Sequence, residues 1–279
     1  MKRKKTGLTI IELLIVLGII ALLVGLLVPA VSAVKKMAKE TKQKAQFVTI
    51  ELALEAFKND YGDYPPSKAY GGQVFTYSSG SQALAEALLG WDLLGFHPNS
   101  AWRADGLDEQ MGPGTYDPAQ TRDINGDGIP DTFDERKGPY LELANVGAFR
   151  PVDLFGTYLF LSEPNTFMIC DVFGAKKISM ANGKIVRAGA PILYYRANTS
   201  GKMTRTIYRP FDNIWLVIAK ERADSRRHPL TDPFYFYESI KNPKITVRDW
   251  PYRPDSYILI SAGADGLYGT PDDITNFGN

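Results

Sequence analysis

From Leu8 to Val28 the chain is an almost unbroken run of apolar residues with a single carboxylate, Glu12. About 20 apolar residues in a row are enough to cross the hydrocarbon core of a bilayer as a helix. A charged side chain in such a helix is costly unless it is paired, so we expect Glu12 to have a functional partner. Four basic residues at positions 2–5 keep the start of the chain in the cytoplasm and send the remainder outward.

A partner for Glu12 would be created if the chain were cut after Gly7. Leu8 would then carry a new α-amino group about one helical turn from Glu12. The amine of a neighbouring subunit could pair with the carboxylate and favour assembly. Three other interpretations of the segment stay open: a secretory signal cleaved near residues 31–33, a plain single-span anchor, and a buried helix of a soluble core. The run is too long for the first, and the last should have a polar stripe, which is missing here.

The segment KKTGLTIIELLIVLGIIALLVGLLVPAV resembles the class III signal of type IV pilins and of type II secretion pseudopilins. In that family a prepilin peptidase cleaves after the glycine and methylates the new N-terminal residue, which is usually Phe and here is Leu. The resemblance implies that Gly7 ends the leader and that Leu8 is the methylated terminus. It also implies that Glu12 is the assembly carboxylate and that Pro29 kinks the helix.

The helix is expected to continue beyond the membrane. No glycine or proline occurs between Val34 and Tyr61, and apolar residues recur at spacings of three and four. A helix from Leu8 to Tyr61 would be about 80 Å long at about 1.5 Å per residue. Residues 62–66 include one glycine and two prolines, which end it. The stretch FKNDYGDYPPS resembles the end of the long helix in the major pseudopilin. The apolar stripe consists of Phe47, Ile50, Leu54, Phe57 and Tyr61.

Short strands and turns are expected in the rest of the chain. One amphipathic helix is predicted at Ser81–Leu94, and residues 98–137 form a long loop rich in Gly, Pro, Asp and Asn. Short apolar runs bounded by turn residues favour antiparallel strands, and a long helix followed by such strands is an α+β, pilin-like fold. The predicted strands are Tyr158–Leu161, Thr166–Val172, Lys176–Met180, Ile192–Arg196, Ile214–Ile218 and Tyr257–Ser261.

These patterns divide the chain into four parts. They are a leader at 1–7, a transmembrane and assembly helix at 8–29, the amphipathic half of the same helix at 30–64, and a globular head at 65–279. The head includes the insert 98–137 and a C-terminal loop at 261–279. Without the four basic residues of the leader, the formal net charge falls from +1 to −3, which gives no sign of nucleic-acid binding. Cys170 is the only cysteine, so no disulfide within the chain can close the C-terminal loop.

Two aspartate-rich segments are candidate calcium sites. The first has oxygen-bearing side chains at alternate positions followed by a glycine, as at the start of an EF-hand loop. Pro130 and the lack of flanking helices favour a helix-free loop, like those of dockerins or thrombospondin repeats. The alternative is an acidic turn that only hydrogen-bonds its own backbone. The candidate ligands are Asp123, Asn125, Asp127, Ile129, Asp131 and Asp134.

The second segment, from Ser261 to Phe277, resembles the C-terminal calcium loop of the major pseudopilin of type II secretion. There a Ser-x-Gly-x-Asp-Gly segment and a later Asp-Ile-x-Asn segment fold around one ion. Carboxylates so close in sequence repel one another unless a divalent cation lies between them. The alternative is a frayed acidic tail. The resemblance implies carboxylate ligands from Asp265, Asp272 and Asp273, with backbone carbonyls near Ala262 and Leu267.

The remaining polar residues form no catalytic pattern. His97 and His228 are isolated from other potential metal ligands, and the basic residues at 222–228 are typical of a solvated loop. No phosphate-binding loop, nucleophile elbow or HExxH motif occurs. We therefore expect the protein not to be an enzyme.

The resemblance implies a pseudopilin subunit with one or two bound Ca²⁺ ions. Its precursor would be a single-pass protein of the inner membrane with the head in the periplasm. The prepilin peptidase and methylase would process it, and an inner-membrane assembly platform would polymerise it with copies of itself. The helical filament, periplasmic or at the cell surface, would drive type II secretion. Two alternatives remain: a type IV pilin or minor pilin for adhesion or motility, and a membrane-anchored calcium-binding module that does not polymerise.

Overall fold

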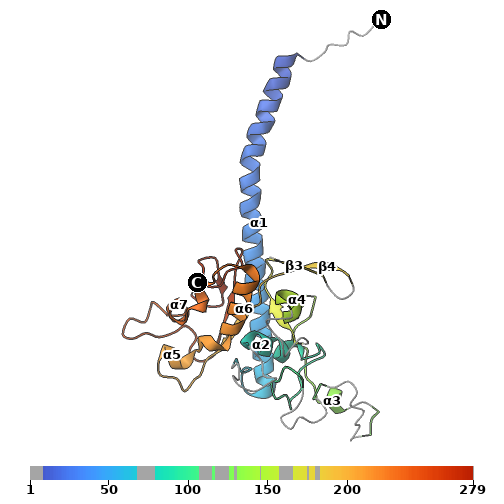
Figure 1. The fold of residues 1–279 in the computed structure, drawn as a ribbon, viewed down its shortest axis with the longest axis vertical. Helices are drawn as coiled ribbons and strands as arrows, with labels where there is room; N and C mark the ends of the chain where they lie inside the picture. Colours follow the sequence, from blue (N-terminus) through green and yellow to red (C-terminus); the bar gives the residue numbers. More distant parts are fainter. Residues whose placement is uncertain are drawn as a thin grey trace. The chain divides into compact units, whose positions relative to one another are not determined.

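The chain forms two units in the computed structural model, residues 1–41 and residues 42–279. Helix α1 (Ile10–Tyr61) begins in the first unit and ends in the second. Figure 1 shows the chain coloured from one end to the other. The structure describes residues 9–67, 79–106, 115–116, 126–128, 131–144, 146–156, 166–174, 176–179 and 183–278.

Helix α1 runs without interruption through Pro29. Proline lacks one backbone N–H, so local melting or a kink was expected there. The helix instead continues, because one missing hydrogen bond leaves the flanking ones in place. The hydroxyl of Ser32 also donates to the carbonyl oxygen of Val28 (3.1 Å). The predicted end of the helix at Tyr61 is confirmed.

A three-stranded antiparallel sheet lies at the centre of the second unit. Its order is β5 (Leu193–Arg196), β6 (Tyr257–Ser261) and β7 (Ile274–Thr275). Leu193 pairs with Ile260, and Ser261 pairs with Ile274. All five residues of β6 are buried, which explains why this strand is apolar on both faces.

Each face of this sheet packs against helices. The side chains of Tyr194 and Leu259 belong to one core with the apolar stripe of α1 and with α2 (Gly80–Leu89). Those of Tyr195 and Ile258 belong to another core with α6 (Ile214–Asp224) and α7 (Pro233–Ser239). The predicted stripe on α1 is confirmed, since Phe47, Ile50, Leu54 and Phe57 are all buried there.

The other elements are short. Two further antiparallel pairs occur in the part of the chain that the structure describes, β1 with β2 and β3 with β4. A long N-terminal helix followed by small antiparallel sheets is the predicted α+β, pilin-like arrangement. The remaining elements are α3 (Asp131–Asp134), β1 (Gly147–Phe149), α4 (Pro151–Phe155), β2 (Met168–Cys170), β3 (Lys176–Ser179), β4 (Ile185–Ala188), α5 (Thr204–Ile207), η1 (Pro210–Asp212) and η2 (Pro229–Thr231).

Two predicted elements were wrong. The apolar run Ile214–Ile218 begins helix α6 rather than a strand, because helix-forming residues follow it and extend it to eleven residues. The helix predicted at Ser81–Leu94 ends at Leu89, because Gly90 adopts a positive φ of 90° and its N–H caps the carbonyl oxygen of Glu86. The strand predicted at Tyr158–Leu161 lies outside the described residues.

Asp171 is a buried carboxylate that should make the head less stable as the pH rises. The N–H groups of Phe173 and Ala190 donate to its Oδ1 (3.1 Å each), and the hydroxyl of Ser261 donates to its Oδ2 (3.0 Å). Burial outweighs these bonds and raises the pKa of Asp171 from 3.8 to about 6.

A carboxyl group whose pKa is raised by folding stabilises the fold below its unfolded pKa and loses this contribution as the pH rises through the folded pKa. A shift of about 2 units therefore predicts that the free energy of unfolding falls by about 3 kcal/mol between about pH 4 and pH 7. Urea unfolding across this range would measure the fall. Asp171→Asn should remove this part of the slope, and an equal slope in the variant would contradict the assignment.

Candidate functional site

Glu12 lies in the first turn of α1, where it forms a capping box with Thr9. The N–H and the hydroxyl of Thr9 both donate to Glu12 Oε2 (2.8 Å each), and the N–H of Glu12 points to the hydroxyl of Thr9 (3.4 Å). Thr9 is a residue that the sequence analysis missed, although the T-x-x-E pattern of a capping box was visible. The cleavage residues Gly7 and Leu8 lie outside the described residues.

The first unit exposes apolar side chains along the whole of its helix. Every residue from Thr9 to Lys39 is exposed, and the run that includes Ile10, Leu22 and Leu26 has no covering side chains from the described residues. Among those residues, α1 is the one helix long and apolar enough to cross a membrane. An apolar surface of this extent is stable only against lipid or against other helices.

The C-terminal loop joins β6 to β7 in a closed turn. Gly263 has a positive φ of 63°, and a side chain there would collide with the carbonyl oxygen of Asp272. The N–H of Asp265 donates to Asp272 Oδ2 (3.0 Å), which also ties the two ends of the loop together. The tail is therefore an ordered loop and not a frayed end.

The three carboxylates of this loop accept hydrogen bonds from the loop itself. Asp265 Oδ1 accepts from the N–H of Leu267 (2.7 Å), and Asp272 Oδ1 accepts from the hydroxyl of Thr270 (2.7 Å). Asp273 Oδ2 accepts from the N–H of Gly269 (2.7 Å). No three Asp, Glu, His or Cys side chains are gathered as a ready-made metal centre in the described part of the chain.

Asp273 is nevertheless short of partners. Its Oδ1 is buried and accepts no hydrogen bond from the described residues. Burial, with added repulsion from Asp272 and Asp265, raises the pKa of Asp273 to about 8. A buried carboxylate oxygen of this kind is one that a bound cation would satisfy, so the donor set fits a hard divalent ion such as Ca²⁺.

Two residues from the predicted solvated basic loop hold the C-terminal loop in place. The guanidinium of Arg226 donates to the carbonyl oxygen of Asp265 (2.7 Å). His228 is fully buried, and its Nδ1 accepts from the N–H of Tyr268 (3.0 Å). The solvated-loop interpretation was therefore wrong for these two positions, because sequence spacing could not reveal the distant loop that they contact.

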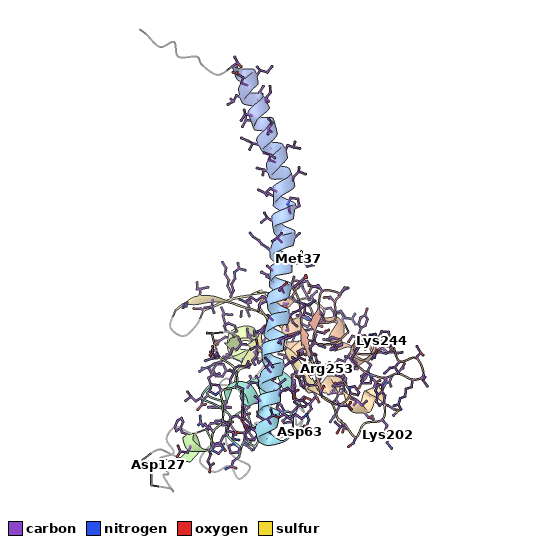
Figure 2. The ribbon with its side chains drawn as sticks, turned by 180° about the vertical axis from the view of Figure 1, so that it is seen from behind. Met37, Asp63, Asp127, Lys202, Lys244 and Arg253 are labelled. Carbon is purple, nitrogen blue, oxygen red and sulfur yellow. The ribbon has the colours of Figure 1, made fainter. Side chains whose placement is uncertain are left out.

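The structure describes only part of the other aspartate segment. Asp123, Asn125 and Ile129 lie outside the described residues. Gly126 and Gly128 adopt positive φ angles of 77° and 85° around the exposed Asp127, which Figure 2 labels. Asp131 and Asp134 are the first and last residues of α3. Calcium binding by this segment stays a prediction.

Three curated proteins are similar to parts of this chain, each called type II secretion system core protein G. The protein from Aeromonas hydrophila is 33% identical over 67 residues, which are 24% of this chain and 47% of that protein, so the chain spans about half of its length. The protein from Klebsiella pneumoniae is 24% identical over 133 residues, 48% of this chain and 93% of that protein. The protein from Dickeya chrysanthemi is 26% identical over 136 residues, 48% of this chain and 86% of that protein. No family model matches the chain, and no solved structure matches it significantly.

Proposed function

We propose that this chain, which its three relatives support as a member of the pseudopilin family, is a structural subunit that polymerises into a type II secretion filament. The observation that carries the proposal is a spanning helix with one carboxylate, Glu12, in its first turn. Such a subunit performs no catalysis. Membrane helices would form the inside of the filament and the heads its surface.

Glu12 would change partners during assembly. In the single chain its carboxylate is satisfied by the N–H and hydroxyl of Thr9. Cleavage after Gly7 would create a cationic amine at Leu8, and the amine of a neighbouring subunit would offer Glu12 an opposite charge in a medium of low dielectric constant. This exchange would favour stacked subunits. Repetition of one heterologous contact gives an open helical polymer, which is the form of a filament.

The C-terminal loop would bind one Ca²⁺ ion. Asp265, Asp272 and Asp273 would supply carboxylate oxygens, and backbone carbonyls near Ala262 and Leu267 would complete the shell. The orphaned, buried Oδ1 of Asp273 supports this choice. The ion would replace hydrogen bonds that the loop now makes with itself and would close the loop as a disulfide does in other folds. The segment from Asp123 to Asp134 is a second candidate on its sequence pattern alone.

The precursor would lie in the inner membrane with its head in the periplasm. Its partners would be the prepilin peptidase and methylase, an inner-membrane assembly platform and further copies of itself. The basic positions 2–5 support this orientation, and the exposed apolar surface of α1 supports a membrane location before assembly. The filament would be periplasmic or at the cell surface.

The size of the head favours keeping a second candidate. The Klebsiella relative's 133 matched residues are 93% of its length, so this chain of 279 residues is about twice as long. The extra residues, which include the insert 98–137, would suit a type IV pilin or minor pilin that binds a surface. Electron microscopy of material sheared from cells, with and without a functional outer-membrane secretin, separates these roles. Secretion through the secretin but no adhesion is the expected result, and adhesion without secretion favours the pilin.

The mature chain is expected to begin at Leu8 with an N-methyl group. Mass spectrometry of the intact protein and of its N-terminal peptide from membranes tests this expectation. A strain without the prepilin peptidase is the control, and there the chain should still begin at Met1. A mature chain that begins near Val34, or that keeps its leader in the wild-type strain, would rule out the proposed processing.

A further inference from the structure

Three residues far apart in sequence connect the C-terminal tail to helix α1. Glu51 Oε1 accepts from a guanidinium N–H of Arg253 (2.5 Å) and from the side-chain amide of Asn276 (3.0 Å). The same guanidinium nitrogen of Arg253 also donates to the carbonyl oxygen of Asn276 (3.0 Å). These residues form what we call the Glu51 cluster, and Figure 2 labels Arg253 where it lies beside α1.

Arg253 is held in an unusual backbone conformation within this cluster. Its φ is 48°, in the left-handed region that non-glycine residues rarely adopt. The hydroxyl of Tyr208 donates to its carbonyl oxygen (2.5 Å), and its guanidinium lies 5.1 Å from the centre of the Tyr257 ring. Such a conformation persists only where the surroundings fix it, so the position of Arg253 is set by the fold and not by Glu51 alone.

Asn276 connects the cluster to the C-terminal loop. Its Oδ1 accepts from the N–H of Leu259 in β6 (2.8 Å), and its own N–H donates to the carbonyl oxygen of Leu259 (3.3 Å). Asn276 directly follows β7, and β7 directly follows Asp273 of the loop. Whatever closes or opens the loop therefore changes the pairing of β7 and the position of Asn276 on α1.

We propose that the Glu51 cluster couples the C-terminal loop to the assembly helix, so that a closed loop makes the adjoining part of α1 more rigid. Glu51, Arg253 and Asn276 are positioning residues in this scheme, and none of them is a proposed ligand of Ca²⁺. The inference rests on the proposed function in one respect, because the importance of a rigid α1 lies in assembly. The coupling itself can be measured without calcium and without filaments.

Hydrogen exchange of the full-length chain in detergent tests the coupling. Gly263→Ala should open the loop, because the new side chain would collide with Asp272 and would require a positive φ. We expect amides of residues 47–57 in α1 to exchange at least about threefold faster in this variant. Asn276→Ala should cause a similar increase by itself, and the double variant should show no further increase, because the path is already broken. Effects that simply add, or an unchanged α1 in Gly263→Ala, would overturn the proposal.

Two controls separate this coupling from general destabilisation. Asp60→Asn removes another polar contact between α1 and the head, the one with Lys137 and Tyr140, and the effect of Gly263→Ala should persist in that background. CaCl₂ alone should slow exchange in the loop of both wild type and Asn276→Ala, but in α1 of wild type only. If CaCl₂ slows neither segment, the calcium part of the proposed function fails, while the Gly263→Ala comparison still decides the coupling.

Discussion

Glu12→Val is expected to abolish filaments while leaving a processed chain in the membrane. Valine removes the one carboxylate of the spanning run, so the helix becomes more compatible with lipid, and no acidic group remains to pair with a neighbour's amine. Electron microscopy of sheared material and the amount of chain in the membrane fraction measure the two effects. A loss of at least about tenfold in filaments with unchanged membrane content is the expected result.

Thr9→Ala is the matched control for this experiment. It removes the capping hydroxyl that now contacts Glu12, at a cost of about 1 kcal/mol to the end of the helix, but it keeps the carboxylate. If Glu12 acts by pairing with a new terminus, Thr9→Ala should still form filaments. If the role of Glu12 were only to cap α1, both variants would assemble equally well or equally poorly, and the pairing scheme would be wrong.

The elements that were predicted correctly are those in which burial follows a simple pattern. The stripe on α1 repeats with the period of a helix, and Tyr257–Ser261 is apolar throughout because both faces of β6 are covered. The run Ile214–Ile218 has the same composition but begins a helix. A buried helix and a buried strand present the same short apolar run, and what distinguishes them here is the length of the favourable residues that follow.

The site was predictable where its residues are close in sequence. Glu12 and the three loop aspartates were found from spacing and family resemblance, whereas Glu51, Arg226 and His228 were not. Glu51 contacts residues more than 200 positions away, and Arg226 reaches the carbonyl oxygen of Asp265 across 39 positions. A single sequence carries no signal for such contacts, because they depend on how β6, β7 and α6 pack together.

Calcium is expected to raise the melting temperature of the head by about 5–10 °C. A ligand at 100 times its dissociation constant that binds only the folded form adds about 2.7 kcal/mol. For a unit of this size, each kcal/mol moves the midpoint by about 2–4 °C. Sites in extracellular modules bind Ca²⁺ at about 0.1–1 mM, so the scan should compare high millimolar CaCl₂ with EDTA, followed by circular dichroism on the full-length chain in detergent.

Asp273→Asn should lose most of this calcium-dependent shift. Asparagine keeps the shape of the side chain and can still accept from the N–H of Gly269, but it cannot supply the charge that a hard cation prefers. Asp255→Asn, which removes an exposed carboxylate outside the loop, should keep the full shift. MgCl₂ should not replace CaCl₂, because Mg²⁺ demands a small octahedral shell that an irregular loop does not provide. Equal melting temperatures in CaCl₂ and EDTA for the wild-type chain would remove calcium from the account of this loop.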